Sequence, residues 1–176
     1  WTPDFGPSEF NEKAGVTAIG VRDFLIAYNV NINTADRKKA TDIALDIREQ
    51  GRAKRDQKGK ILRDSKGNII KVPGKLKSVK AVGWYIDEYK QAQVSMNLTS
   101  YKTTSLHKAF ETVRQAASKR GLRVTGSEIV GLVPKEAILE SGIFYLKKQK
   151  SLTSIPEKDI IDCAIISLGL NDISNF

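Results

Sequence analysis

Residues 91–99 read QAQVSMNLT, and in this stretch polar and apolar side chains alternate without a break. Ala92, Val94, Met96 and Leu98 would share one face of a strand, because successive side chains of a strand point to opposite faces. The amide and hydroxyl side chains between them would share the other face. Such a strand belongs to an antiparallel sheet with one face packed on helices and one polar face. The stretch therefore predicts a half-buried strand.

Strand and helix patterns alternate on both sides of this stretch. Strands are predicted at residues 24–32, 78–88, 91–99 and 123–133. Helices are predicted at 34–51 with Thr34 as the cap, at 105–120, from Pro134 through Tyr145, and after a capping box of Ser154 and Glu157. The order strand, helix, strand, strand, helix, strand is that of the ferredoxin-like plan. The predicted fold class is α+β: a ferredoxin-like βαββαβ antiparallel sheet with two additional C-terminal helices and a basic hairpin insertion.

The insertion carries the whole charge imbalance of the chain. The 176 residues have a formal net charge of +9. Residues 48–80 hold twelve Lys or Arg and three acidic residues. In the other 143 residues the basic and acidic side chains are equal in number. A β-hairpin is predicted at 61–70, turning near Lys66-Gly67, within an insertion of about 52–77, and no internal repeat is predicted. The segment is interpreted either as a solvated insertion or as an arm that attracts an anion, such as a nucleic acid or a polycarboxylate.

Composition excludes several classes of site. The single Cys163 excludes a disulfide framework, and one cysteine with the single His107 cannot hold zinc. The sequence contains no phosphate-binding glycine loop, and a single histidine leaves no meaningful Ser-His-Asp spacing. No apolar run approaches the roughly 20 residues of a membrane helix. His107 is interpreted as a helix-surface or cap residue and Cys163 as a core thiol, in a cytoplasmic protein with no metal and no membrane partner.

Polar residues on two predicted strands suggest a second surface. Asn29 and Asn31 from one strand, and Gln93, Ser95 and Asn97 from another, would share the sheet face opposite the helices. They could line a ligand cleft, meet a second domain, or simply face water, and these alternatives stay open. The glycines of the sequence GSEIVG at 126–131 either admit a ligand close to the backbone or mark bulges.

Five strings of residues resemble one family. They are WTPDFGP at 1–7, FLIAYNVN at 24–31, IREQGR at 47–52, VGWY at 82–85 with AQVS at 92–95, and GSEIVGLVP at 126–134. From Trp1 to about Phe176 the chain resembles the C-terminal subdomain of glutamate formimidoyltransferase, as in the formiminotransferase-cyclodeaminase family. It departs from the family in the basic segment at about 54–75, which is longer than the corresponding loop.

The resemblance implies a transferase that moves a formimino group between 5-formimidoyltetrahydrofolate and L-glutamate in histidine degradation. Tetrahydrofolate would be the carrier, bound between this half and an N-terminal subdomain that supplies the catalytic histidine, so this chain alone would have no catalytic residue and be inactive. Residues 1–20 would form the inter-subdomain connection, and 21–176 the C-terminal subdomain. The resemblance assigns folate contacts to a run of ten residues: Gly6, Pro7, Ser8, Glu9, Phe10, Asn11, Glu12, Lys13, Ala14 and Gly15.

The expected partners are folate, glutamate and the N-terminal subdomain, while homo-oligomerisation stays open. The alternative is a ferredoxin-like nucleic-acid-binding module that uses the basic segment at 48–80. RNA-recognition domains of this plan stack bases on aromatic residues in a glycine-flanked strand motif. The chain lacks that motif, so nucleic acid is the disfavoured partner.

Overall fold

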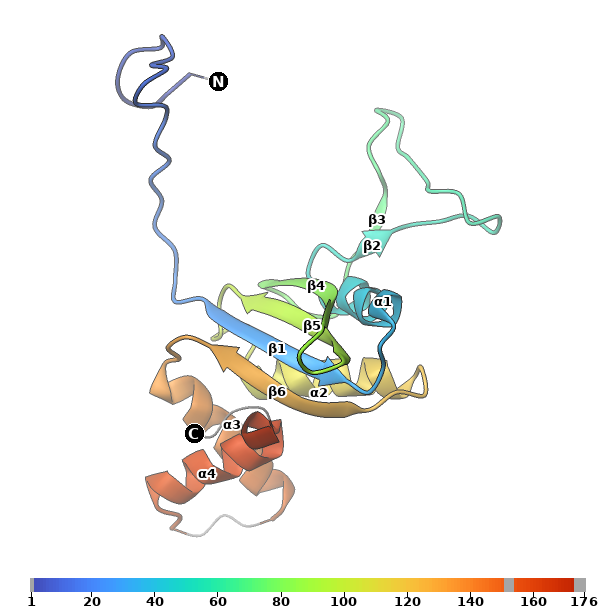
Figure 1. Ribbon diagram of the computed structural model, residues 1–176, viewed down its shortest axis with the longest axis vertical. Helices are drawn as coiled ribbons and strands as arrows, with labels where there is room; N and C mark the ends of the chain where they lie inside the picture. The colour runs from blue at the N-terminus through green and yellow to red at the C-terminus, as the bar shows by residue number, and fades with distance from the viewer. Residues whose placement is uncertain (1, 151–153, 173–176) are drawn as a thin grey trace.

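The computed structural model describes residues 2–150 and 154–172. Trp1, which opens the predicted connection, and residues 173–176 lie outside the described part. Four strands form one antiparallel sheet in the order β4-β5-β1-β6 (Figure 1). These strands are β1 (Ile26–Ile32), β4 (Val79–Ile86), β5 (Gln91–Leu98) and β6 (Val124–Val130). The predicted mixed α+β architecture and its antiparallel sheet are confirmed.

Four helices accompany the sheet. They are α1 (Arg37–Ile47), α2 (Leu106–Ser118), α3 (Lys135–Lys148) and α4 (Glu157–Leu168), followed by a 3-10 turn, η1 (Leu170–Asp172). Helices α1 and α2 cover one face of the sheet, and α3 and α4 pack on each other beside it (Figure 1). In the part of the chain that the structure describes, no helix combines the length and the apolar character needed to span a bilayer.

The alternation at residues 91–99 produces the predicted burial on the helix side. Ala92, Val94, Met96 and Leu98 are at most 1% exposed. The next strand in the sheet, β1, contributes Ile26, Tyr28, Val30 and Ile32 to the same core, all fully buried. Burying apolar side chains stabilises a fold by about 25 cal/mol per Å² removed from water. The apolar faces of β5 and β1 therefore anchor the two covering helices.

Two predicted helix caps are wrong. Helix α1 is capped by Asp36, whose carboxylate accepts the backbone N–H of Lys38 at 2.8 Å, and not by Thr34. Helix α4 begins at Glu157 after Pro156 and has no side-chain cap, so Ser154 and Glu157 form no capping box. Pro156 occupies the N-cap position and has no side-chain oxygen, so it cannot accept the first N–H groups of the helix.

The prediction that the chain holds no internal repeat is also wrong. The insertion reads RDQKGKIL at 55–62 and RDSKGNII at 63–70. In both copies the Asp carboxylate accepts the backbone N–H groups two and four residues later, at 2.8–2.9 Å. In both, the Arg side chain donates to the carbonyl of the glycine, at 2.6 and 2.8 Å. The insertion thus contains two equivalent turns, of which the second is the hairpin predicted near Lys66-Gly67.

The two turns grow from a three-way junction of backbone hydrogen bonds. Lys54 N–H donates to Ile70, Leu62 N–H donates to Lys54, and Ile70 N–H donates to Leu62, at 2.8–3.0 Å. The third limb is the stem of β2 (Arg52–Ala53) and β3 (Lys71–Val72), which joins the junction to the domain. Figure 1 shows the two turns pointing in different directions beyond this stem.

One glycine sets how closely α1 approaches the sheet. A Cβ atom at Gly83 of β4 would lie 2.0 Å from the backbone nitrogen of Thr41 and 2.4 Å from the carbonyl carbon of Ala40. Both atoms belong to α1 backbone, which cannot yield as a flexible side chain would. The Thr41 hydroxyl also donates to the Gly83 carbonyl at 3.3 Å. The helix therefore rests directly on the strand at this point.

Gly83→Ala should accordingly destabilise the chain by about 3 kcal/mol, because the helix must move away from a packed core. Gly20→Ala is the matched control, since a Cβ there meets nothing within 4 Å. The control should change stability by no more than about 0.5 kcal/mol. Urea unfolding followed by circular dichroism measures both, and equal midpoints for the two variants would contradict the close approach.

Candidate ligand site on the open face of the sheet

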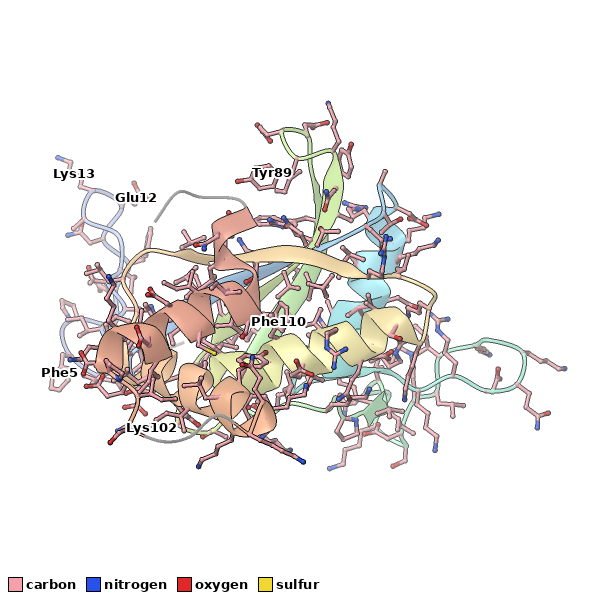
Figure 2. All side chains as sticks on the ribbon, turned by 90° about the horizontal axis from the view of Figure 1, so that it is seen from below. Phe5, Glu12, Lys13, Tyr89, Lys102 and Phe110 are labelled. Carbon is pink, nitrogen blue, oxygen red and sulfur yellow. The ribbon has the colours of Figure 1, made fainter. Side chains whose placement is uncertain are left out.

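No helix of the described residues lies over the face of the sheet that is turned away from α1 and α2. We call it the open face. Figure 2 shows Tyr89 on this side of the sheet, whereas Phe110 lies on the helix side. The strand register places these side chains on the open face: Lys80, Val82, Trp84 and Ile86 of β4; Gln91, Gln93, Ser95 and Asn97 of β5; Ala27, Asn29 and Asn31 of β1; and Gly126, Glu128 and Val130 of β6. The predicted clustering of the two asparagines of β1 with the polar residues of β5 is confirmed.

A hydrogen-bond network links four of these residues across the whole width of the sheet. The Trp84 indole N–H donates to Gln93 Oε1 at 2.8 Å, and Gln93 Nε2 donates to Glu128 Oε1 at 3.0 Å. Asn29 Nδ2 donates to the same Glu128 oxygen at 2.9 Å. An indole can only donate, so Trp84 fixes which end of the Gln93 amide faces Glu128. The network thus has one orientation, and it ends on the carboxylate.

The turn of the β4–β5 hairpin carries the fifth residue of this network, Tyr89. Tyr89 lies in the tight turn between β4 and β5, where Lys90 adopts a φ of +51°. The Tyr89 hydroxyl donates to Glu128 Oε2 at 3.4 Å, which is a long contact, and the residue is 38% exposed. The negative charge of Glu128 raises the pKa of the Tyr89 hydroxyl, with a smaller effect of desolvation. Tyr89 therefore stays neutral and able to donate.

One polar atom under this hairpin has no partner. Asn31 is 4% exposed, and its Oδ1 is buried with no hydrogen-bond partner among the described residues. Across the sheet Asn31 faces Gln93 on one side and Gly126 on the other, and Gly126 contributes no side chain. A buried, unsatisfied polar atom costs about 1–3 kcal/mol. The open face thus combines a fixed polar network with one unsatisfied acceptor.

A groove of about 490 Å³ runs along the outer edge of β4, beside the open face. Lys80 and Val82 belong to both surfaces, and Arg48 and Glu49 line the far side of the groove. Its lining contains both charge signs and no member of the network. The hydrogen-bonding groups that could orient a ligand therefore lie on the open face. The groove adjoins the open face at its β4 edge.

Comparison with known proteins identifies the family. The formiminotransferase domain matches residues 27–176. The chain belongs to the formiminotransferase family. It is 42% identical over 176 residues to the formimidoyltransferase-cyclodeaminase of Mus musculus and 44% identical over 176 residues to that of Dictyostelium discoideum. Each of these alignments covers all of this chain and 29% of the relative. It is 39% identical over 147 residues to the glutamate formimidoyltransferase of Thermoplasma acidophilum, covering 84% of the chain and 41% of the relative.

The ten residues to which the resemblance assigns folate contacts lie apart from the network of this formiminotransferase domain. Residues 2–24 run away from β1 and are exposed, apart from a half-buried Pro3 (Figure 1). Gly6 through Gly15 make hydrogen bonds only within the segment: Asn11 Oδ1 accepts the N–H groups of Lys13 and Ala14, and Gly15 N–H donates to the Asn11 carbonyl. The structure does not bring these ten residues to the open face.

Three residues of the network were not predicted as site residues. Glu128 sits within the quoted sequence GSEIVG, where only the glycines drew attention. Trp84 falls in the strand predicted at 78–88, and Tyr89 falls between that strand and the one predicted at 91–99. Glu128 could have been identified as a charged residue on the strand next to Asn29 and Asn31. That identification requires the register between β1 and β6, which pairs Glu128 with Asn29. Ser95 and Asn97 do lie on the open face, further from the network.

The two residues with familiar catalytic chemistry lie elsewhere. His107 is in the first turn of α2, stacked on Phe144 of α3 with ring centroids 4.2 Å apart. Its Nε2 is 3.1 Å from the Ser105 hydroxyl. The predicted position near the start of the helix is confirmed, but the ring packs against α3. Cys163 of α4 is partly buried against the core, as predicted.

Glu128→Leu should cost about 2 kcal/mol, because it leaves the buried N–H groups of Asn29 and Gln93 without their acceptor. Glu128→Gln keeps an oxygen at the same place and should cost less than about 1 kcal/mol. Urea unfolding of the two variants gives the comparison. If both variants lose the same stability, the charge of Glu128 rather than its acceptor oxygen holds the network together.

Stability should fall as the pH drops below about 7 because of His107. Burial lowers the pKa of His107, although Glu111 partly opposes this. As the pH falls, the unfolded chain therefore takes up a proton near pH 6.5, before the folded chain does, so stability falls until the pH reaches the lower pKa of the folded state, and the full loss persists below it. His107→Gln should remove this dependence, since the chain has one histidine. Thermal unfolding between pH 5 and 8 tests it, and identical pH slopes for both proteins would contradict it.

Proposed function

We propose that this chain supplies one wall of the folate site of a glutamate formimidoyltransferase, and that the protein moves a formimino group between 5-formimidoyltetrahydrofolate and L-glutamate in histidine degradation, in the cytoplasm. The observation that carries the proposal is the oriented network on the open face, which ends on Glu128. Relatives named as formimidoyltransferases support it. The chain spans 29% of the length of the bifunctional relatives, so the reaction needs groups beyond this chain.

The ferredoxin-like plan is part of the proposal. The strand order β4-β5-β1-β6 supports it, because the chain passes from a central strand through a helix to one edge of the sheet and ends at the other edge. Helices α1 and α2 lie on a single face, as that plan requires. This leaves the opposite face for a second subdomain and the ligand between them.

A second subdomain would also explain the exposed apolar side chains near the N-terminus. Phe5, Ile19 and Val21 are more than 90% exposed, and Phe10 is 70% exposed. Exposed apolar groups gathered in one stretch indicate a surface that another unit covers. We propose that the N-terminal subdomain covers it, and that the turn from Gly6 to Gly15 then contacts the folate held between the two units.

This chain would bind and orient the folate but would not move protons. Formimino transfer passes through a tetrahedral carbon, and a general acid–base must shuttle a proton between two amines. His107 belongs to α2 on the helix side of the sheet and is stacked on Phe144, away from the open face. The open face offers amides, an indole and a carboxylate, which suit recognition. Proton transfer therefore falls to the N-terminal subdomain.

The basic insertion favours no second function. Residues 48–80 contain no aromatic residue on which a base could stack. Arg52 pairs with Asp46 at 2.6 Å, and Arg55 and Arg63 are held by the glycine carbonyls of their own turns. The cations left for an anion are mainly lysines, which bind phosphates through charge alone.

The isolated chain should bind folinic acid, a stable folate analogue, and show no formimino transfer. Removing residues 1–20 should weaken this binding at least fivefold, because the Gly6–Gly15 turn is lost. Chemical shift changes in 15N-labelled protein detect dissociation constants into the millimolar range. Turnover by residues 1–176 alone would contradict the division of labour. Salt-dependent RNA binding with no response to folinic acid would overturn the proposal in favour of the nucleic-acid alternative.

A further inference from the structure

The basic insertion has a defined backbone structure of its own, outside the main sheet. Its two turns repeat the same contacts, and their glycines, Gly59 and Gly67, adopt φ values of +81° and +83°. Residues with a side chain rarely adopt that backbone region. A loop that only connects two elements does not need one turn geometry built twice. The insertion therefore holds the residues of both turns in fixed positions.

The base of the insertion is fixed to the domain as well. Arg52 of β2 pairs with the Asp46 carboxylate of α1 at 2.6 Å and donates to the Asp42 carbonyl at 2.8 Å. A Cβ atom at Gly74 would lie 1.9 Å from the Arg48 carbonyl oxygen, so backbone lies directly on backbone where the insertion rejoins the domain. A surface that is already ordered loses little conformational freedom when a partner binds it.

The charge that the insertion leaves free belongs to lysines. Asp56 and Asp64 accept backbone N–H groups of their own turns, and Arg55 and Arg63 donate to the glycine carbonyls. Six lysine ammonium groups have no hydrogen bond or ion pair with any residue that the structure describes: Lys54, Lys58, Lys60, Lys66, Lys71 and Lys75. These cations can pair with an anionic partner without breaking a contact within the chain.

Aliphatic side chains are exposed beside these lysines. Ile69, Ile70 and Val72 are 39%, 37% and 46% exposed. They lie at and below the three-way junction, since the Ile70 backbone belongs to it and Val72 is in the stem. The ends of the two turns carry Lys58 and Lys66 instead. A partner that covers the insertion would meet charge at the turns and apolar surface between them and the stem.

This arrangement distinguishes three kinds of anionic partner. The insertion offers a nucleic acid no aromatic residue for stacking, and the arginines of its turns, which could hold phosphates in a bidentate manner, are engaged. A flat anionic membrane would reach the lysines at the turn ends and leave the aliphatic side chains near the stem in water. A protein surface can follow this relief and supply both carboxylates and apolar groups.

We propose that the insertion is a docking surface for an acidic protein. The partner's carboxylates pair with Lys58 and Lys66 at the ends of the turns, and its apolar side chains cover Ile69, Ile70 and Val72. The inference goes beyond the proposed function and does not depend on it, because the insertion shares no residue with the network on the open face.

The first variant removes the lysines and keeps the turns. Lys58→Gln with Lys66→Gln should weaken binding to an acidic partner at least fivefold, because two charge pairs at the turns are lost. Lys102→Gln with Lys119→Gln is the matched control, since both lysines are exposed, lie outside the insertion and carry the same charge. The control should keep the affinity within twofold.

The second variant separates shape from charge. Asp56→Ala with Asp64→Ala raises the net charge by two but removes the acceptors that hold both turns. Binding should weaken at least threefold, whereas attraction by charge alone would strengthen it. A third variant replaces residues 55–69 by Asn-Gly, a two-residue turn that closes the ladder at Lys54 and Ile70. It should lose the binding, keep the melting temperature and still bind folinic acid.

The probes are two fluorescein-labelled peptides of equal length and charge, which repeat the sequences Glu-Leu-Ser-Glu and Glu-Ser-Ser-Glu. Fluorescence anisotropy measures their affinity for the chain, and the leucine peptide should bind at least threefold more tightly. A carbodiimide, which joins carboxylates to amines, should link this peptide to Lys58 and Lys66, as mapped by mass spectrometry. Oligouridylate RNA and vesicles that contain phosphatidylserine are titrated under the same conditions.

Several results would overturn the inference: no binding of the leucine peptide, equal losses in the two lysine variants, or tighter binding by the Asp56→Ala, Asp64→Ala chain. RNA or vesicles that bind more tightly than the peptide, and that the Asn-Gly variant no longer binds, would replace the acidic protein with a nucleic acid or a membrane. Folinic acid binding by the Asn-Gly variant is read separately, so the docking surface can fail while the proposed function stands.

Discussion

Two buried amides, from Asn29 and Gln93, donate to the same oxygen of Glu128, and the polar face of the sheet depends on this shared acceptor. Buried amide groups destabilise a fold unless each finds a partner. Without Glu128 the central strands would carry unsatisfied donors on a face that no helix covers. With it, the two amides and the Trp84 indole take fixed orientations. Asn31, one step along β1, lies outside this arrangement and keeps an unpaired oxygen.

The helix side is held by a different kind of contact. Backbone meets backbone at Gly83, where α1 rests on β4, and at Gly142, where α3 approaches the Ile160 carbonyl of α4. A buried chain of hydrogen bonds adds to this: the Tyr28 hydroxyl donates to Ser127, and the Ser127 hydroxyl donates to the Leu168 carbonyl at the end of α4. This chain fastens α4 to the sheet. The rigid side of the domain thus supports a face whose polar groups are positioned but not covered.

The sequence predicted the parts of the fold that follow from local periodicity. The alternation at 91–99 and the apolar spacing at 105–120 predicted both elements and their buried faces, since burial repeats every two or 3.6 residues. The caps at Thr34 and Ser154 were wrong because several residues near a helix start can serve, and backbone geometry chooses among them. The repeated turns at 55–70 depend on the Arg-Asp and Lys-Gly pairs that both copies share, and such turn chemistry leaves no trace in apolar periodicity.

The candidate site was only half predictable for a related reason. The polar residues of β1 and β5 could be placed on one face from alternation alone, but their acceptor comes from β6, 99 residues after Asn29. Only the register of β1 with β6 brings Glu128 level with Asn29. Tyr89 is harder still to predict, because it reaches Glu128 from a turn, where strand register does not tell which way a side chain lies.

The charge, the histidine and the network occupy three separate places, and this separation limits what the chain can do by itself. The insertion that carries many of the lysines extends beyond β2 and β3 (Figure 1), and His107 of α2 is packed against Phe144 of α3. The open face joins buried amides to two partly exposed aromatic rings, Trp84 and Tyr89. Its groups are amides, an indole, a phenol and a carboxylate, which can recognise a ligand through hydrogen bonds. A ligand bound there would therefore present its other side outward, toward whatever group completes the reaction.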